Sequence, residues 1–346
     1  MRKGLLIGWC VVVGLFLAAG IVLPSFAENV VKSQSAVRKN IELLKDKQYE
    51  HEAIVALESL GETAVPFMAD ATKNPKEKVS QRILLIEILG DIKSPSATAV
   101  LLETLKDPNF KIRRASARSL GDIGDKASVQ GLKQALDDFD PQVRYYAARS
   151  LVNTKDPALG DVFIKLLDNA DVRIRISAVE GLGEIKETRA VEKLSTMTED
   201  HNDDVRLSLA IALGKIGTKD TIPALNRLLE DTNIKIRREA LRALGKVGDP
   251  SSISYLTKIA ERDEKDLRMS ATMALGDIGT DEVIPTLKKL LRDEAIDVRL
   301  AAIESLTKIG KAEFIKDFEP LLKDESMKVR HTAETGLEKL RAGKGM

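Results

Sequence analysis

The chain has 346 residues, of which 43% are hydrophobic and 31% charged, and its formal net charge at neutral pH is +1. This composition excludes global disorder, and the near-zero net charge argues against bulk attraction to nucleic acid or anionic lipid. Aromatic residues make up only 4% of the chain. A core with so few rings must be built from aliphatic side chains, as small helix-on-helix interfaces are.

The first 27 residues have the pattern of an export signal. Arg2 and Lys3 form a basic start, and residues 4–23 are uncharged and mostly apolar. Ser25 and Ala27 then occupy the small-residue positions that a signal peptidase requires. We expect cleavage after Ala27, which makes residues 1–27 a signal peptide and leaves residues 28–346 as the mature chain.

The same segment has a second interpretation. Its apolar run, residues 4–23, is long enough to span a bilayer, so an uncleaved membrane anchor is the alternative. In both cases we expect export to the periplasm or another extracytoplasmic space, with the anchor tethering the chain to the inner membrane. Cys10, the sole cysteine, lies within this run, so the exported part has neither a disulfide nor a cysteine metal ligand.

The rest of the chain is a repeat of 31 residues. Nine copies can be aligned on an arginine, at Arg82, Arg113, Arg144, Arg175, Arg206, Arg237, Arg268, Arg299 and Arg330. A leucine stands seven residues after the arginine in all nine copies, and an aliphatic residue precedes the arginine in eight. Offsets −1, +3, +7 and +10 from the arginine form one stripe at helical spacing, which predicts a helix, here named helix B.

A shorter helix, named helix A, is predicted before each helix B. In the stretch "TIPALNRLLEDT", the apolar residues Ile222, Leu225, Leu228 and Leu229 fall on one face. A polar turn then leads into helix B, with an aspartate six residues before the arginine. This aspartate is Asp107, Asp138, Asp200, Asp231, Asp293 or Asp324, whereas Asn169 and Arg262 depart from the pattern.

Two sets of glycines recur in register. Six copies have glycine eight residues after the arginine, at Gly90, Gly121, Gly183, Gly214, Gly245 and Gly276. Glycine inside a helix costs about 1 kcal/mol of helix propensity, so its recurrence predicts close approach of a neighbouring helix. Glycines three residues further on, such as Gly248, suit a helix C-terminal cap.

Each unit is therefore predicted to be a helical hairpin, and hairpins of this size bury their apolar faces only by stacking. The predicted fold is all-α, an α-solenoid (α-α superhelix) of about ten stacked hairpins within residues 28–346. An imperfect unit, Ala36–Gly61, has Ala53 in place of the arginine and is expected to cap the N-terminal end. The last unit has Glu338 in place of the glycine, which is typical of a polar C-terminal edge.

Copies such as "DTNIKIRREALRALGKVG" and "DPNFKIRRASARSLGDIG" resemble the HEAT-repeat family, in particular the short HEAT-like repeats of phycobilisome lyases. The resemblance implies a stacked helical fold. It also implies that the turn aspartate and the arginine are structural and tie neighbouring repeats together. The residues given this role are Asp107, Arg113, Asp138, Arg144, Asp231, Arg237, Asp293 and Arg299. The alternative is that the nine arginines form an anion-binding stripe.

The sequence has no constellation typical of catalysis. His51, His201 and His331 lie several repeats apart and cannot share a metal ion. No phosphate-binding glycine loop or nucleophile elbow is present. We therefore expect no enzyme activity, no cofactor and no metal, and the alternative is a lyase or metal-dependent enzyme built on HEAT-like repeats. Nucleic-acid binding is not expected because glutamates interrupt the basic residues along successive B helices.

The residues at offsets +1 and +5 of helix B point away from the main stripe and vary between copies, as a surface fitted to one partner would. One cluster combines tyrosine and arginine, which often anchor interfaces: Arg114, Arg118, Tyr145, Tyr146 and Arg149. A second is apolar: Leu207, Ile211, Met269 and Met273. Ordinary solvated surface and inter-repeat core are the respective alternatives. The predicted function is an exported, non-enzymatic scaffold that binds a protein or peptide partner through the B helices.

Overall fold

The structure, a computed structural model, describes residues 24–342. Most of the predicted signal segment therefore lies outside the described residues, and its cleavage or retention stays a prediction. The first described helix, α2 (Pro24–Leu43), includes the predicted cleavage position after Ala27 in its first turn. Within residues 24–342, no helix combines the length and the apolar character needed to cross a membrane.

The described residues form twenty α-helices and no strand, which confirms the all-α prediction. Contacts divide the chain after Thr154 into two units. Unit 1 contains α2 (Pro24–Leu43), α3 (Glu50–Leu60), α4 (Val65–Lys73), α5 (Val79–Asp91), α6 (Thr98–Thr104), α7 (Phe110–Ile123), α8 (Val129–Ala135) and α9 (Pro141–Thr154).

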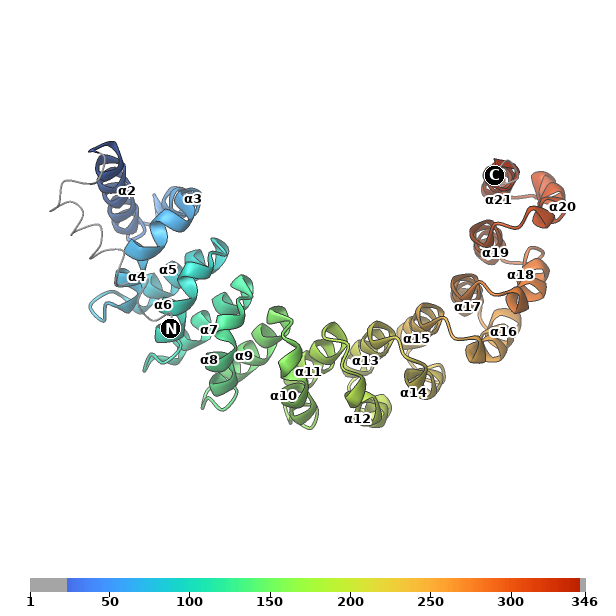
Figure 1. Cartoon of the computed structure of the whole chain (residues 1–346), viewed down its shortest axis with the longest axis horizontal. Helices are drawn as coiled ribbons and strands as arrows, with labels where there is room; N and C mark the ends of the chain where they lie inside the picture. The colour runs from blue at the N-terminus through green and yellow to red at the C-terminus, as the bar shows by residue number, and fades with distance from the viewer. Residues whose placement is uncertain (1–23, 343–346) are drawn as a thin grey trace. The chain divides into compact units, whose positions relative to one another are not determined.

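Unit 2 begins at Lys155. It contains α10 (Gly160–Leu166), α11 (Val172–Glu184), α12 (Val191–Thr196), α13 (Asp203–Ile216), α14 (Ile222–Leu228), α15 (Ile234–Val247), α16 (Ile253–Arg262), α17 (Lys265–Ile278), α18 (Ile284–Leu290), α19 (Ile296–Ile309), α20 (Ile315–Phe318) and α21 (Met327–Ala342). Within each unit the even-numbered helices are the A helices and form one layer, and the odd-numbered B helices form the other (Figure 1).

The core lies between these two layers. In α15, Ile236, Ala240 and Leu244 are fully buried, as expected for offsets −1, +3 and +7. The leucine at offset +7 is at most 2% exposed in every copy. Burying a leucine fully contributes about 2 kcal/mol, so every repeat gains a similar contribution from this one register position.

Successive B helices pack directly against one another at the internal glycines. A Cβ added to Gly245 would lie 2.9 Å from the Cα of Ala274 on α17. In unit 1, Gly121 faces Ser150, whose hydroxyl donates a hydrogen bond of 2.8 Å to the Ala117 carbonyl. The prediction that these glycines mark close helix contacts is confirmed. The partner position, six residues after the next arginine, is correspondingly small.

The second glycine set caps the B helices. Gly248 has φ +70°, and its N–H donates to the carbonyl of Leu244 at 3.1 Å. Three copies instead have a lysine with positive φ at this position, namely Lys93, Lys155 and Lys186, at φ +53°, +48° and +53°. A left-handed conformation costs a residue with a Cβ about 1 kcal/mol. These copies therefore carry local strain that the glycine copies lack.

Replacing Lys186 by glycine is expected to raise the free energy of unfolding by about 0.5–1 kcal/mol, after allowance for the greater chain entropy of glycine. Urea unfolding followed by circular dichroism measures the change. Lys186→Ala is the matched control, because alanine removes the charge but keeps the Cβ. If the alanine variant gained as much stability as the glycine variant, backbone strain would not be the cause.

The two ends differ from the regular units. The N-terminal hairpin is α2 with α3, where Ala53 is fully buried at the position of the missing arginine. At the other end, α20 has only four residues and continues as a 3₁₀ segment, Glu319–Lys323. Pro320 has no N–H to donate, so it cannot extend an α-helix there.

Candidate functional site

The arginine and aspartate side chains that recur in each repeat form a ladder of ion pairs along the turns between A and B helices. Arg113 donates from Nε and Nη2 to the carboxylate of Asp138, in the next repeat, at 2.7 and 2.8 Å. Its Nη1 donates to the carbonyl of Asp107, in its own turn, at 2.9 Å. One guanidinium thus fastens two consecutive turns. The ion pairs are Arg82–Asp107, Arg113–Asp138, Arg175–Asp200, Arg206–Asp231, Arg268–Asp293 and Arg299–Asp324.

The ladder leaves these guanidinium groups little capacity for an external anion. The hydrogen bond from Arg113 lowers the pKa of Asp138, although burial opposes the shift. The same contact raises the pKa of Arg113 above its usual value. Asp138 also accepts the N–H of Asp140 at 2.8 Å, so its carboxylate orders the turn as well as the ion pair.

Two of the predicted structural arginines lie where the pattern is broken. Arg237 donates to the carbonyl of Asp231 at 2.8 Å, but the next turn has Arg262 in the aspartate position, and Glu264 approaches only to 4.0 Å. Arg144, in unit 1, donates to the carbonyls of Asp138 and Phe139 at 2.8 and 3.1 Å.

The arginines of the Tyr/Arg cluster, on α7 and α9, are largely engaged within unit 1. Arg114 lies 5.4 Å above the ring of Phe110 and 3.5 Å from the carboxylate of Asp140. Arg118 lies 4.0 Å from Glu87 on α5. Their charges are therefore partly neutralised by neighbouring repeats.

The tyrosines of this cluster stack on each other. The rings of Tyr145 and Tyr146 are 5.0 Å apart between centroids and tilted by 48°. Both side chains are half-buried, and Arg149, one turn further along α9, is exposed. The structure thus brings the five residues onto two adjacent B helices, as the repeat register required.

The apolar cluster is not one continuous strip. Leu207 and Ile211 are half-buried on α13, and on α17 Met269 is half-buried and Met273 is 50% exposed. Helix α15 packs between α13 and α17, so the two apolar pairs lie on either side of it. The intervening helix presents arginines at the same two register positions.

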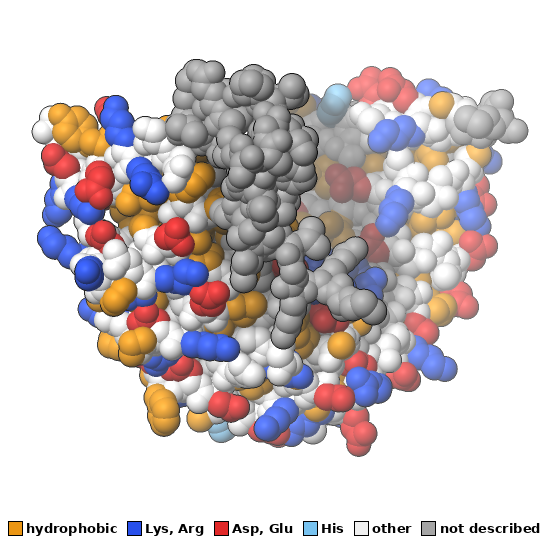
Figure 2. Space-filling view, turned by 60° about the vertical axis from the view of Figure 1, so that its left-hand side comes forward, with side chains coloured by type: hydrophobic (Ala, Val, Ile, Leu, Met, Phe, Trp, Pro, Cys, Tyr) orange, Lys and Arg blue, Asp and Glu red, His pale blue; other side chains and the backbone are white. Residues whose placement is uncertain are grey.

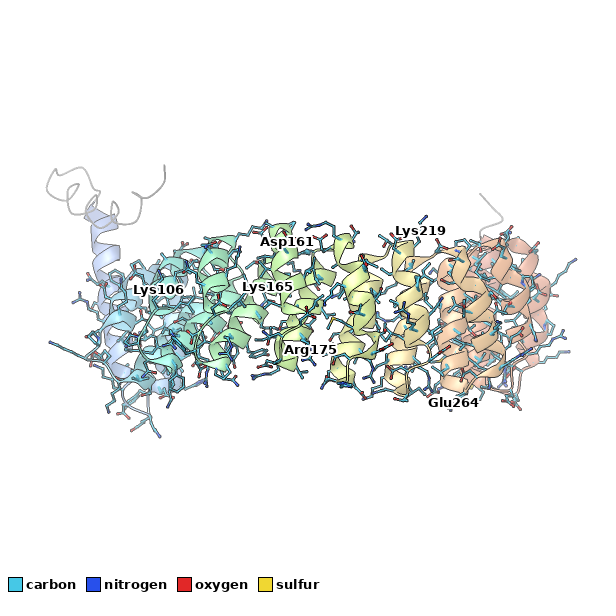
Figure 3. The ribbon with its side chains drawn as sticks, turned by 90° about the horizontal axis from the view of Figure 1, so that it is seen from below. Lys106, Asp161, Lys165, Arg175, Lys219 and Glu264 are labelled. Atoms are coloured by element: carbon cyan, nitrogen blue, oxygen red, sulfur yellow. The ribbon has the colours of Figure 1, made fainter. Side chains whose placement is uncertain are left out.

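The sequence analysis missed two exposed aromatic residues, Phe139 in the turn before α9 and Phe110 at the first position of α7. Phe139 is 99% exposed and Phe110 is 41% exposed. A phenylalanine within the run "DDFDP" is a signal that could have been noticed, because the corresponding turns are polar. In Figure 3, Arg175 and Glu264 mark the edge of unit 2 where the A–B turns lie, and Asp161 and Lys219 mark the opposite edge.

The A-helix layer of unit 2 contains a groove of about 650 Å³ beside α18 and the 3₁₀ segment that follows α20. Its charged side chains largely pair with one another: Lys288 lies 3.0 Å from Asp317, and Lys289 lies 2.9 Å from Glu261. Across residues 24–342, no group of histidine, cysteine and acidic side chains is arranged to hold a metal ion. The face turned forward in Figure 2 mixes acidic and basic side chains without a field of one sign.

These features define an α-solenoid whose repeat motif residues are used in stacking. The family description "HEAT repeats" matches residues 65–139, 129–214, 196–276 and 259–338, and the chain belongs to the HEAT-repeat family. No curated protein sequence matches the chain.

Two solved structures share the fold at low sequence identity. An engineered protein is 20% identical with a TM-score of 0.52, covering 88% of this chain and 99% of its own. A chain from the complex of Kap95p with RanGDP is 12% identical with a TM-score of 0.63, covering 93% of this chain and 51% of its own. A chain from the complex of CpcE and CpcF of phycocyanin lyase from Nostoc sp. PCC7120 is 23% identical. The match covers 80% of this chain and 94% of the other, with a TM-score of 0.34.

Proposed function

We propose that this chain is a non-enzymatic protein-binding scaffold that acts outside the cytoplasm and holds its partner on the B-helix surface. The observation that carries the proposal is that each helix B has one set of register positions that is buried and another that is accessible to a partner. Offsets −1, +3, +6, +7 and +8 are spent on burial and close packing, whereas offsets +1 and +5 stay half-buried or exposed. The first set is small or aliphatic apart from Gln81, Thr307 and Glu338, whereas the second set ranges from arginine and tyrosine to leucine and methionine.

Two further considerations support the proposal. A stack of hairpins offers an extended surface on which a partner can contact several repeats at once. Kap95p, whose binding alters the switch loops of RanGDP, is an example of a protein with a similar fold that recognises another protein. Export rests on the sequence of residues 1–27, and tethering through residues 4–23 is its alternative form.

Site-specific photocrosslinking in the native cell tests the proposal. A crosslinker is placed on the B layer at Arg118 or Met273, and on the A layer at the exposed Lys165 as a matched control (Figure 3). We expect discrete protein adducts from the two B-layer positions and none from Lys165. Equal adducts from all three positions, or none from any, would contradict the proposal.

Export and the enzymatic alternative are tested on the same material. The mass of the mature N-terminus shows whether cleavage follows Ala27, and fractionation shows on which side of the membrane the chain lies. A lyase or metal-dependent enzyme would be revealed by a chromophore in the absorbance spectrum or a stoichiometric metal in elemental analysis of the purified chain.

A further inference from the structure

Helix α15 carries a row of cations on the face opposite its buried stripe. Lys235, Arg238, Arg242 and Lys246 are spaced at i, i+3, i+7 and i+11, which places them along one side of the helix. All four are exposed, whereas Ile236 on the opposite side is fully buried. The row therefore lies along the middle of the B-helix surface of unit 2.

The two central arginines stand between apolar side chains. At the level of Arg238, the neighbouring helices α13 and α17 present Leu207 and Met269. At the level of Arg242, one turn further on, they present Ile211 and Met273 by the same register. B helices pack about 10 Å apart. One bound segment could therefore contact each arginine together with the apolar side chains of the two neighbouring helices.

Acidic side chains also occur around this surface, and they lie near the two ends of the row of cations. Asp204 and Asp266 lie on the neighbouring helices at the level of Lys235. At the other end, near Lys246, the acidic residue Asp277 is paired with Lys308 at 2.6 Å. The positive charge that is not paired with a neighbouring helix is thus centred on the two arginines, of which Arg242 is paired within α15 with Glu239.

Comparison with α7 shows that this arrangement is specific. Arg114 and Arg118 occupy the same register positions on α7, but both have carboxylates from neighbouring repeats within 4.0 Å. Arg238 has no carboxylate within ion-pair distance among the described residues. Arg242 pairs with Glu239 of its own helix, and the residues of α13 and α17 at that level, Ile211 and Met273, are apolar.

We infer that α13, α15 and α17 together bind an acidic amphipathic segment of a protein partner. Its carboxylates would pair with Arg238 and Arg242, since guanidinium and carboxylate form strong charge-assisted hydrogen bonds. Its apolar side chains would pack on Leu207 and Ile211 on one side and on the methionines on the other. This inference rests on the proposed function and adds the chemistry of the partner.

A nucleic acid fits the same surface poorly. Its phosphates would leave the four apolar side chains without a matching contact, and Asp204 and Asp266 would repel it. Aromatic residues on which bases could stack are absent from the register positions that carry the surface.

Selection of peptides from a random 16-residue display library, with the full chain as the target, tests the inference. We expect enriched peptides with acidic residues flanked by apolar ones. The double variant Arg238→Ala/Arg242→Ala should weaken their binding about tenfold or more, and Met269→Gln/Met273→Gln should weaken it several-fold. Lys165→Ala/Lys258→Ala, which removes two exposed cations from A helices of unit 2, is the matched control and should change binding less than twofold. Unchanged thermal melting shows that the variants remain folded.

Several results would overturn the inference: no enrichment, a consensus without acidic residues, equal loss in the A-helix control variant, or duplex DNA that competes as well as the selected peptides. The crosslinking experiment separates this failure from failure of the proposed function. Partner adducts from Arg118 or Met273 that persist after substitution of Arg238 and Arg242 would leave the scaffold intact and reject only the acidic segment.

Discussion

Replacing Asp138 by alanine is expected to lower the free energy of unfolding by about 3 kcal/mol. The substitution leaves Arg113, whose side chain is only 16% exposed, without the carboxylate that accepts two of its hydrogen bonds. Removing one partner of a largely buried ion pair costs about 3–5 kcal/mol, and partial exposure places this pair at the lower end. Urea unfolding of the variant, compared with the parent chain, measures the loss.

Acid titration provides the control for this prediction. Because the folded state lowers the pKa of Asp138, the carboxylate contributes stability above its unfolded pKa of about 4. That contribution is lost as the pH falls through the lower pKa of the folded state. The difference in stability between parent and variant should therefore shrink below about pH 4. A difference that stays constant down to pH 2 would show that the ion pair is not its source.

Replacing Gly245 by valine is expected to destabilise the chain by about 3 kcal/mol, because the added Cβ meets backbone atoms that cannot move aside cheaply. The Cα and carbonyl oxygen of Ala274 would lie 2.9 and 3.3 Å from it. The two B helices would have to separate along their shared contact. Thermal and urea unfolding of the variant measure the effect.

The neighbouring substitution Lys246→Val is the matched control, since Lys246 is exposed on the same helix and valine has the same low helix propensity there. We expect it to change stability by less than about 0.5 kcal/mol. Because valine is a better helix former than glycine, similar losses from the two variants would indicate that the contact with Ala274 is not the source of the cost.

Much of the fold could be predicted because each register position has a single physical task. A leucine at offset +7 in every copy predicts a buried stripe, and a glycine inside a helix predicts a close contact. The partner of each arginine is harder to derive, because it lies 25 residues later, in the next turn, while the arginine's own aspartate supplies only a carbonyl. That offset depends on how the hairpins stack.

The candidate site was less accessible from sequence. Offsets +1 and +5 follow from the position of the core, so the exposed face could be predicted. The sequence does not show that Arg114 is neutralised by Asp140, since this contact joins a helix to the following turn. It also does not show that Arg238 lacks an ion pair among the described residues, whereas both arginines of α7 lie within 4.0 Å of a carboxylate from a neighbouring repeat.

The substitution of Arg262 for the usual aspartate has a mechanical consequence. Repeats are coupled only to their neighbours, so the joint between the turn of Arg237 and the next turn is held there by a single 4.0 Å approach of Glu264. On heating, we expect these two turns to separate before the turns of unit 2 that an Arg–Asp pair joins, while α15 and α17 stay packed at Gly245. A ligand that spans α13 to α17 would bridge the two repeats on either side of this joint. Binding of the partner would therefore also stabilise the joint against local unfolding.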